Sequence, residues 1–185
     1  MNVLVVGGEG YIGKVLCNYL ISKSNYVRSY DNLIYGHYNQ EKKNNYQFIF
    51  GDIGNIEKFS NSLDGIDCVV LLSGLVGDPI TKKYPNESNL INDIYLKQVI
   101  NEINNTNIQK LIFISTCSNY GYINEDSQAD ENYELKPLSL YAKSKVEIEN
   151  YILDTKKTND ISTTILRFST AFGLSPRMRF DLTIN

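Results

Sequence analysis

Histidine, cysteine and tryptophan are scarce in this chain of 185 residues, which has one histidine, three cysteines and no tryptophan. The cysteines, Cys17, Cys68 and Cys117, are too few and too widely spaced for a disulfide framework or a zinc site. The single histidine, His37, lies in a polar stretch. A nucleophile paired with a histidine base and a histidine-ligated metal are therefore both disfavoured, and we expect no metal.

The chain also lacks an excess of positive charge and any long apolar run. With 18 basic and 21 acidic residues its net charge is -3, which gives no support to nucleic acid or an anionic membrane as a partner. No apolar run approaches the roughly 20 residues of a transmembrane helix, and no secretory signal opens the sequence. We therefore expect a cytoplasmic protein.

Apolar segments of strand length alternate with segments of helical periodicity, which predicts an α/β fold. Six such strands predict a doubly wound, Rossmann-like parallel sheet in three α/β/α layers. The predicted strands are residues 3–6, 26–30, 46–50, 67–72, 110–115 and 162–168. The predicted helices are residues 11–23, one from about 55, residues 87–104 and one from 140, with a loop at 32–45. In the first helix, the spacing predicts a packed face of Ile12, Val15, Leu16, Tyr19 and Leu20.

Four glycines follow the first predicted strand. Gly7 allows a sharp turn from strand to helix, and Gly10 lets a pyrophosphate approach the backbone. Gly13 allows the helix to pack closely on the strand, and the helix N-terminus attracts phosphate. An ordinary turn is the alternative, because glycine clusters occur in many turns. The candidate cofactor contacts are Gly7, Gly10, Tyr11, Ile12 and Gly13.

Acidic residues end the second and third predicted strands. Asp31 lies roughly 20 residues past the glycines, where a carboxylate can bond the adenosine ribose and repel a 2'-phosphate. This placement favours NAD over NADP, although Asp31 and Asn32 could simply form a turn. Asp52, followed by Ile53, could reach the adenine, or else cap the helix that starts near Asn55.

A second glycine-bearing loop follows the fourth predicted strand. Leu72, Ser73 and Gly74 lie where this strand ends, at the same edge of the sheet as the first glycine turn. Ligands bind to such folds at the carboxyl ends of the parallel strands. We therefore include these three residues in the candidate cofactor site.

Three tyrosines are followed by a lysine four positions later, so spacing alone does not select among them. The pairs are Tyr19–Lys23, Tyr38–Lys42 and Tyr141–Lys145. Only Tyr141 opens a helix after a strand that ends in hydroxyl residues, Ser115 and Thr116. The ammonium of Lys145 and a positive nicotinamide ring would both favour the phenolate of Tyr141. Thr116 or Ser115 would then hold a substrate hydroxyl for proton transfer.

Together these motifs resemble those of a known family, the extended short-chain dehydrogenase/reductases, and within it the NAD-dependent nucleotide-sugar epimerases and dehydratases. The motifs are Gly7-x-x-Gly10-x-x-Gly13, Asp31, Gly51-Asp52-Ile53, Ser115-Thr116, Tyr120-Gly121 and Pro137-x-x-x-Tyr141-x-x-x-Lys145. The resemblance implies NAD as cofactor and a nucleotide-sugar as substrate. It implies that Tyr141 is the catalytic base, Lys145 its partner and Thr116 the hydroxyl residue. Asn92 matches a structural asparagine of the family and joins the candidate cofactor site.

Two departures from the family pattern restrict the prediction. Cys117 and Ser118 stand where the dehydratases carry acidic residues, so dehydration is disfavoured. We therefore predict a 4-epimerase that transiently oxidises a sugar hydroxyl. A keto-sugar reductase using NAD(P)H and a catalytically silent nucleotide-binding lobe are the alternatives.

The second departure is length. We predict a dinucleotide-binding domain over residues 1–172, and residues 173–185 as the start of a truncated substrate lobe. Arg177 and Arg179 could reach a diphosphate there, or be solvated tail residues. The resemblance also implies that a homodimer could form through the helices of the fourth and fifth crossovers.

Overall fold

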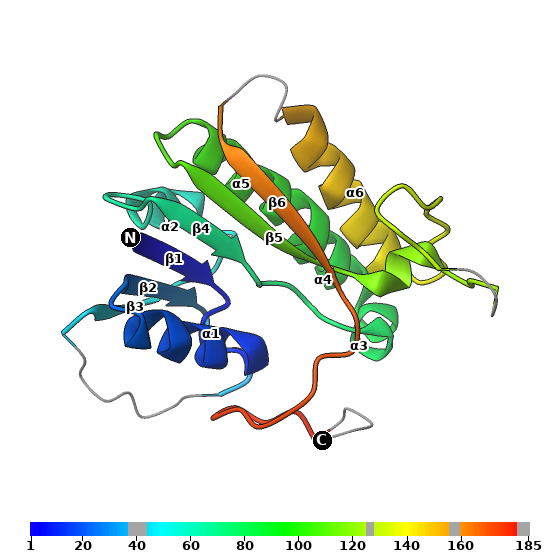
Figure 1. The fold of residues 1–185 in the computed structure, drawn as a ribbon, viewed down its shortest axis with the longest axis horizontal. Helices are drawn as coiled ribbons and strands as arrows, with labels where there is room; N and C mark the ends of the chain where they lie inside the picture. Colours follow the sequence, from blue (N-terminus) through cyan, green and yellow to red (C-terminus); the bar gives the residue numbers. More distant parts are fainter. Residues whose placement is uncertain (37–43, 125–127, 156–159, 181–185) are drawn as a thin grey trace.

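A parallel sheet forms the centre of the molecule, as Figure 1 shows. The computed structural model describes residues 1–36, 44–124, 128–155 and 160–180. Within them, six strands pair in parallel in the order β3-β2-β1-β4-β5-β6. They are β1 (Asn2–Val6), β2 (Tyr26–Asp31), β3 (Tyr46–Phe50), β4 (Cys68–Leu71), β5 (Lys110–Thr116) and β6 (Ser162–Phe168). The predicted doubly wound sheet is confirmed, with the chain reversing direction across the sheet between β1 and β4.

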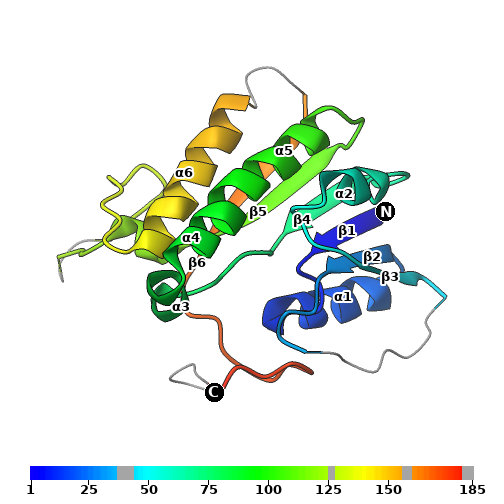
Figure 2. The ribbon, with the colours of Figure 1, turned by 180° about the vertical axis from the view of Figure 1, so that it is seen from behind.

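Helices cover the two faces of the sheet unequally. Three helices, α2 (Ile56–Asn61), α5 (Leu96–Asn104) and α6 (Leu140–Thr155), lie on one face, seen in front in Figure 2. On the opposite face α1 (Tyr11–Ser22) packs against the half of the sheet that contains β1 and β2.

Two buried clusters fill the space between sheet and helices. The larger one lies under α2, α5 and α6 and includes Tyr30, Phe59 and Phe113. Within it the rings of Tyr30 and Phe59 meet edge to face, with their centroids 5.6 Å apart. The smaller cluster lies under α1 and includes the buried cysteines Cys17 and Cys68.

The packed face of α1 differs from the predicted one. Val15 and Tyr19 are exposed, whereas Gly13 and Cys17 are buried against the sheet. A Cβ at Gly13 would lie 2.2 Å from the carbonyl oxygen of Gly7, so the helix approaches the strand along its glycine. That close approach turns the outer apolar residues of α1 toward solvent.

The crossover between β4 and β5 is more broken than the predicted single helix. It contains α3 (Asp78–Lys83) and then α4 (Pro85–Asn89), which continues through a π-helical turn at Leu90–Tyr95 into α5. A short 3-10 turn, η2 (Cys117–Tyr120), follows β5 and was not predicted either. Residues 32–36 and 44–45 contain no helix or strand, as predicted, while residues 37–43, with His37 and the Tyr38–Lys42 pair, lie outside the described residues.

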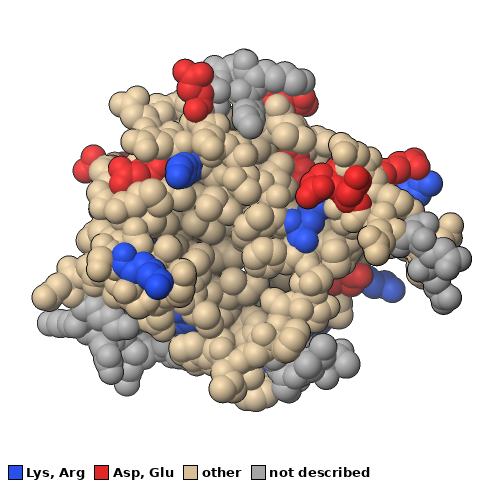
Figure 3. Space-filling model, viewed as in Figure 1, with Lys and Arg blue, Asp and Glu red and all other residues tan. Residues whose placement is uncertain are grey.

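One part of the sheet has no helix over it in the described residues. On β6, Leu166 and Phe168 point to the face that bears α1 and are 36% and 37% exposed. Next to them on β5, Ile112 and Ile114 are only partly buried. Figure 1 shows β5 and β6 uncovered on this side, and in Figure 3 the charged side chains lie mostly around the rim of the same view. We call the four residues Ile112, Ile114, Leu166 and Phe168 the open face.

In the parts of the chain that the structure describes, no helix has both the length and the apolar character needed to cross a membrane.

We expect Gly13→Ala to destabilise the chain by more than 1 kcal/mol in urea unfolding followed by circular dichroism. Alanine favours a helix over glycine by about 1 kcal/mol, so a stabilised variant would contradict this account of the packing. The new methyl would instead meet the backbone of Gly7 and Gly8. Val15→Ala, on the exposed side of the same helix, is the control and should change the free energy of unfolding by about 0.5 kcal/mol or less.

Candidate active site

The turn after β1 has the geometry expected of a phosphate-binding turn. Gly7 adopts a φ of +86°, and its N–H donates to the carbonyl of Tyr30 over 2.8 Å. A Cβ on Gly7 would lie 2.9 Å from the backbone nitrogen of Ser73, so the loops after β1 and β4 touch at this point. Gly10 begins α1 without a capping side chain, which leaves the approach to the helix N-terminus open.

A buried carboxylate that the sequence prediction missed lies beneath this turn. Glu9 is 3% exposed, forms an ion pair with Lys14 and accepts hydrogen bonds from Ser29 and Tyr46. Burial acts to raise the pKa of Glu9, but these hydrogen bonds outweigh it and hold the pKa below its ordinary value. The members of this network are not related by any regular spacing in the sequence. The one signal for it in the sequence is the acidic residue inside the glycine turn.

Asp31 stands at the end of β2 with both carboxylate oxygens held by the backbone. One accepts from the N–H of Glu9 over 3.0 Å and the other from the N–H of Leu33 over 2.8 Å. Burial raises the pKa of Asp31, and the backbone bonds oppose that rise. The carboxylate therefore has a fixed position beside the glycine turn.

Asp52 does not cap α2, because the cap is Asn55, whose side chain accepts from the N–H of Lys58 over 3.1 Å. Instead, Asp52 accepts a 2.7 Å hydrogen bond from the side chain of Asn32. Asn32, Asp52 and Ile53 all line the same cavity as Asp31.

The second glycine loop is held from below by Asn92. Its amide accepts from the N–H of Leu75 over 2.8 Å and donates to the carbonyl of Leu75 over 2.9 Å. Asn92 is buried and does not line the cavity, so the structure gives it the role of supporting the loop. Ser73 does line the cavity, and its buried hydroxyl has no hydrogen-bond partner among the described residues.

The hydroxyl and phenol groups predicted from the sequence lie at the other end of the cavity. Thr116 ends β5, where its Oγ accepts from the N–H of Ser118 over 3.2 Å. Lys145 lies one turn after Tyr141 on α6 and donates to the carbonyl of Ile114 over 2.9 Å. Its ammonium is 5.8 Å from the ring centroid of Tyr141.

The ionisation of this group of residues differs from the prediction in one respect. Burial raises the pKa of Tyr141 to about 12, and the cation that opposes the rise is Arg179. The chain's own groups therefore leave the phenol less acidic than an ordinary tyrosine, and the contribution of Lys145 stays a prediction. Burial also lowers the pKa of Lys145 to about 8.

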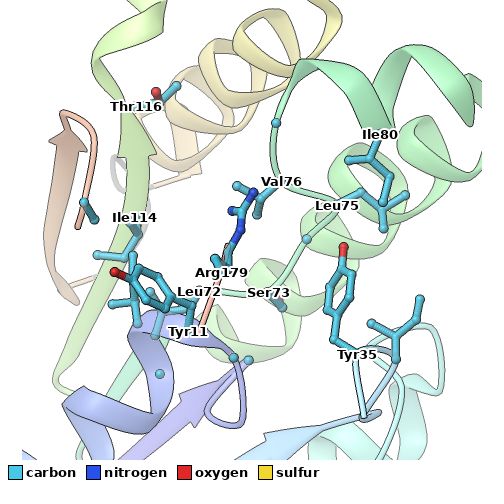
Figure 4. Close-up of a pocket in the computed structure, with 18 of the residues that line it drawn as sticks. Tyr11, Tyr35, Leu72, Ser73, Leu75, Val76, Ile80, Ile114, Thr116 and Arg179 are labelled. Atoms are coloured by element: carbon cyan, nitrogen blue, oxygen red, sulfur yellow. The ribbon is translucent and has the colours of Figure 1, made fainter. Parts of the chain in front are cut away.

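One cavity of about 710 Å³ connects the glycine turn and Asp31 with Thr116, Tyr141 and Lys145. Its volume is within the range of small-molecule sites. Figure 4 shows Tyr11 and Ser73 at one end and Thr116 at the other, with Arg179 reaching in between them. The lining residues include almost every predicted one: Gly7, Gly10, Tyr11, Ile12, Gly13, Asp31, Asn32, Asp52, Ile53, Leu72, Ser73, Gly74, Ser115, Thr116, Tyr141 and Lys145.

The segment after β6 runs along the mouth of this cavity. The hydroxyl of Tyr11 donates to the carbonyl of Gly173, and the hydroxyl of Ser175 donates to the carbonyl of Tyr11, each over 2.7 Å. Arg177 then stacks on the ring of Tyr35, 4.5 Å from its centroid. Arg177 and Arg179 both line the cavity and are not merely solvated tail residues, while residues 181–185 lie outside the described residues.

Within the described residues, the cavity is lined by a free cysteine, Cys117, and by no cluster of metal-ligating side chains. No group of three or more His, Cys, Asp or Glu residues that could hold a metal occurs in the described part of the chain. Cys117 is exposed, and the single histidine lies outside the described residues.

Several known proteins have sequences similar to that of this chain. A UDP-glucose 4-epimerase of Lactobacillus helveticus is 30% identical over 180 residues, which are 95% of this chain and 53% of the relative. The UDP-arabinose 4-epimerase 1 of Arabidopsis thaliana is 28% identical, over 96% of this chain and 45% of the relative. The chain therefore spans about half the length of the curated relatives it matches.

Solved structures of 4-epimerases have a similar fold. The UDP-glucuronic acid 4-epimerase of Bacillus cereus, in complex with UDP-glucuronic acid and NAD, superposes with a TM-score of 0.86 at 28% identity. The match covers 98% of this chain and 60% of that one. A family model described as the NAD dependent epimerase/dehydratase family matches residues 3–184. The chain belongs to the NAD dependent epimerase/dehydratase family.

Proposed function

We propose that this chain is the NAD-binding and catalytic part of a nucleotide-sugar 4-epimerase. The observation that carries the proposal is the single cavity, which joins a glycine turn and Asp31 at one end to Thr116, Tyr141 and Lys145 at the other. The 4-epimerases among the similar proteins support it.

Three features of the cavity fit a dinucleotide. The turn is too tight for a Cβ at Gly7 or Gly13, so backbone N–H groups rather than side chains face the phosphates. Asp31 is already held in place to accept hydrogen bonds from the adenosine ribose. The buried hydroxyl of Ser73, which has no partner among the described residues, lies beside the glycine turn, where it could bond a ligand.

In the proposed reaction the chain's own residues move a proton. Tyr141 takes the proton of the sugar hydroxyl while Thr116 holds that hydroxyl in line. The glycine turn, Asp31 and Lys145 would hold NAD, which would supply a hydride acceptor and donor and a positively charged nicotinamide ring, while inversion requires the keto-sugar to present its opposite face for the return of the hydride. With a pKa of about 12 set by burial, Tyr141 needs added positive charge to act as a base at neutral pH.

The two residues that follow Thr116 favour epimerisation over dehydration. Elimination of water needs a carboxylic acid beside the sugar, but the residues after Thr116 are Cys117 and Ser118. A thiol and a hydroxyl cannot replace that acid.

We also propose that residues 1–172 are the dinucleotide-binding domain and that residues 173–185 begin a second lobe. The open face and the unpaired edge of β6 support this division, because exposed strand edges and apolar faces are normally covered. The relatives are about twice as long as this chain, so turnover is expected to require polypeptide beyond the part described here. A silent nucleotide-binding lobe is the second candidate function, and the open face is the observation that favours it.

Pairing through α5 and α6 as a homodimer stays a prediction, which sedimentation equilibrium would test.

We expect Asp31→Asn to weaken NAD binding by about tenfold and to reduce the preference for NAD over NADP, because the variant loses the charge that repels a 2'-phosphate. Titration calorimetry with each cofactor measures both effects. Asp64→Asn, at an exposed carboxylate remote from the cavity, is the matched control and should bind both cofactors as the wild type does. An unchanged preference in Asp31→Asn would contradict the placement of the ribose.

We expect Tyr141→Phe to lower turnover of UDP-glucose to UDP-galactose by about 10²- to 10⁴-fold, because proton transfer is lost. NAD affinity should change by less than about threefold, since the phenol is only one of many contacts. Proton NMR of the sugar products measures turnover. If the unmutated protein, prepared together with the second lobe, binds NAD tightly but does not turn over the substrate, the epimerase proposal is wrong. The silent nucleotide-binding lobe then becomes the better description.

A further inference from the structure

A second buried ion pair lies behind the catalytic residues, outside the cavity. Glu149 follows Lys145 by one turn of α6 and is 1% exposed. One of its carboxylate oxygens accepts from the amide of Asn119 over 2.8 Å. The other accepts two hydrogen bonds from Arg167 of β6, over 2.7 Å and 3.1 Å.

Through these partners Glu149 is connected to the Ser115–Tyr120 turn, which carries Thr116. The Asn119 amide also donates to the hydroxyl of Ser115 over 3.0 Å. Arg167 donates to the hydroxyl of Tyr120 over 3.1 Å, and its guanidinium lies 5.1 Å from the centre of that ring. One carboxylate thus joins α6, β6 and the Ser115–Tyr120 turn, which are the elements that place Tyr141 opposite Thr116.

Stability alone is a weak explanation for this pair. The cost of removing two charges from water largely offsets their attraction, and apolar replacements of buried ion pairs are often neutral or stabilising. A buried carboxylate with hydrogen bonds to both of its oxygens does, however, hold its partner segments in fixed positions. It also keeps a negative charge at a fixed position on α6, one helical turn after Lys145.

Lys145 is the group on which that charge acts. Its ammonium is buried, donates to the carbonyl of Ile114 and lies 4.6 Å from the ring centroid of Phe113. Burial lowers the pKa of Lys145 to about 8, and the negative charge of Glu149 opposes the fall.

The other ionisable groups nearby act on different residues. Asp78, Cys117 and Arg179 all act on Tyr141, and Arg167 is paired with Glu149. Glu149 is therefore the carboxylate that favours the charged form of Lys145.

We propose that Glu149, held by Arg167, is a positioning residue that fixes the Ser115–Tyr120 turn relative to α6 and keeps a negative charge one helical turn from Lys145. The role rests on the proposed function, which makes Tyr141 and Lys145 the catalytic pair. It predicts two linked effects of removing the carboxylate charge: Lys145 loses its proton at a lower pH, and the Ser115–Tyr120 turn loses a fixed partner.

The test is an NMR titration of Lys145 in the full 185-residue chain, with lysine labelled at Cε and the signal assigned through Lys145→Arg. In Glu149→Gln we expect the midpoint to fall by about one pH unit, because the variant removes an opposite charge from the buried residue one helical turn after Lys145. Glu147→Gln is the matched control on the same helix. Its exposed carboxylate pairs with Lys97 over 3.0 Å, so the midpoint of Lys145 should not move.

A folded Glu149→Gln variant with the wild-type midpoint would overturn the proposal. If that variant shows no cooperative unfolding in urea, the double variant Glu149→Met with Arg167→Met replaces it, since it leaves no unpaired buried charge. Because the positive charge of Arg167 is lost as well, the midpoint of Lys145 should fall by less than in Glu149→Gln, and a midpoint that stays the same or rises would contradict the proposal. The titration needs no substrate, so it can succeed or fail independently of whether the protein proves to be an epimerase.

Discussion

The close contact between the turns that follow β1 and β4 is the constraint on which the site depends. These strands are neighbours in the sheet although β2 and β3 come between them in the chain. Gly7 packs directly on the backbone of Ser73, with no room for a side chain. Since the strands are parallel, the loops that follow β1, β2, β4 and β5 all emerge at one edge, and the cavity lies where they meet.

Buried ion pairs support the cavity at both ends. Glu9 and Lys14 lie beneath the glycine turn. Glu149 and Arg167 lie behind the Ser115–Tyr120 turn. In each pair the carboxylate also binds neutral groups from other elements, so it fixes several segments at once. Such networks contribute more to the geometry of a site than to the net free energy of folding. The open face differs from these supported ends of the cavity, because its apolar side chains are only partly buried and no helix of the described residues covers them.

The sequence predicted the fold and most of the cavity because both depend on local patterns. Strand and helix lengths follow from apolar periodicity, and glycines mark the turns. Asp31, Thr116 and Tyr141 could be located because each stands at the end of a strand or the start of a helix, and in a parallel sheet such positions share one edge. The π-helical turn before α5 and the orientation of α1 could not be predicted, because both involve contacts between segments distant in the chain. The ring of Tyr95 packs against Gly54, and Gly13 packs against the turn after β1.

The sequence by itself therefore determined which residues meet at the carboxyl edge of the sheet. Only the tertiary structure decided their electrostatic environment. The partners of Glu9 and Glu149 include residues of strands and turns that are distant in the chain. Their spacing in the sequence therefore does not predict the contacts. The same holds for Tyr141, whose phenol is made less acidic by burial, because burial depends on how the whole chain packs.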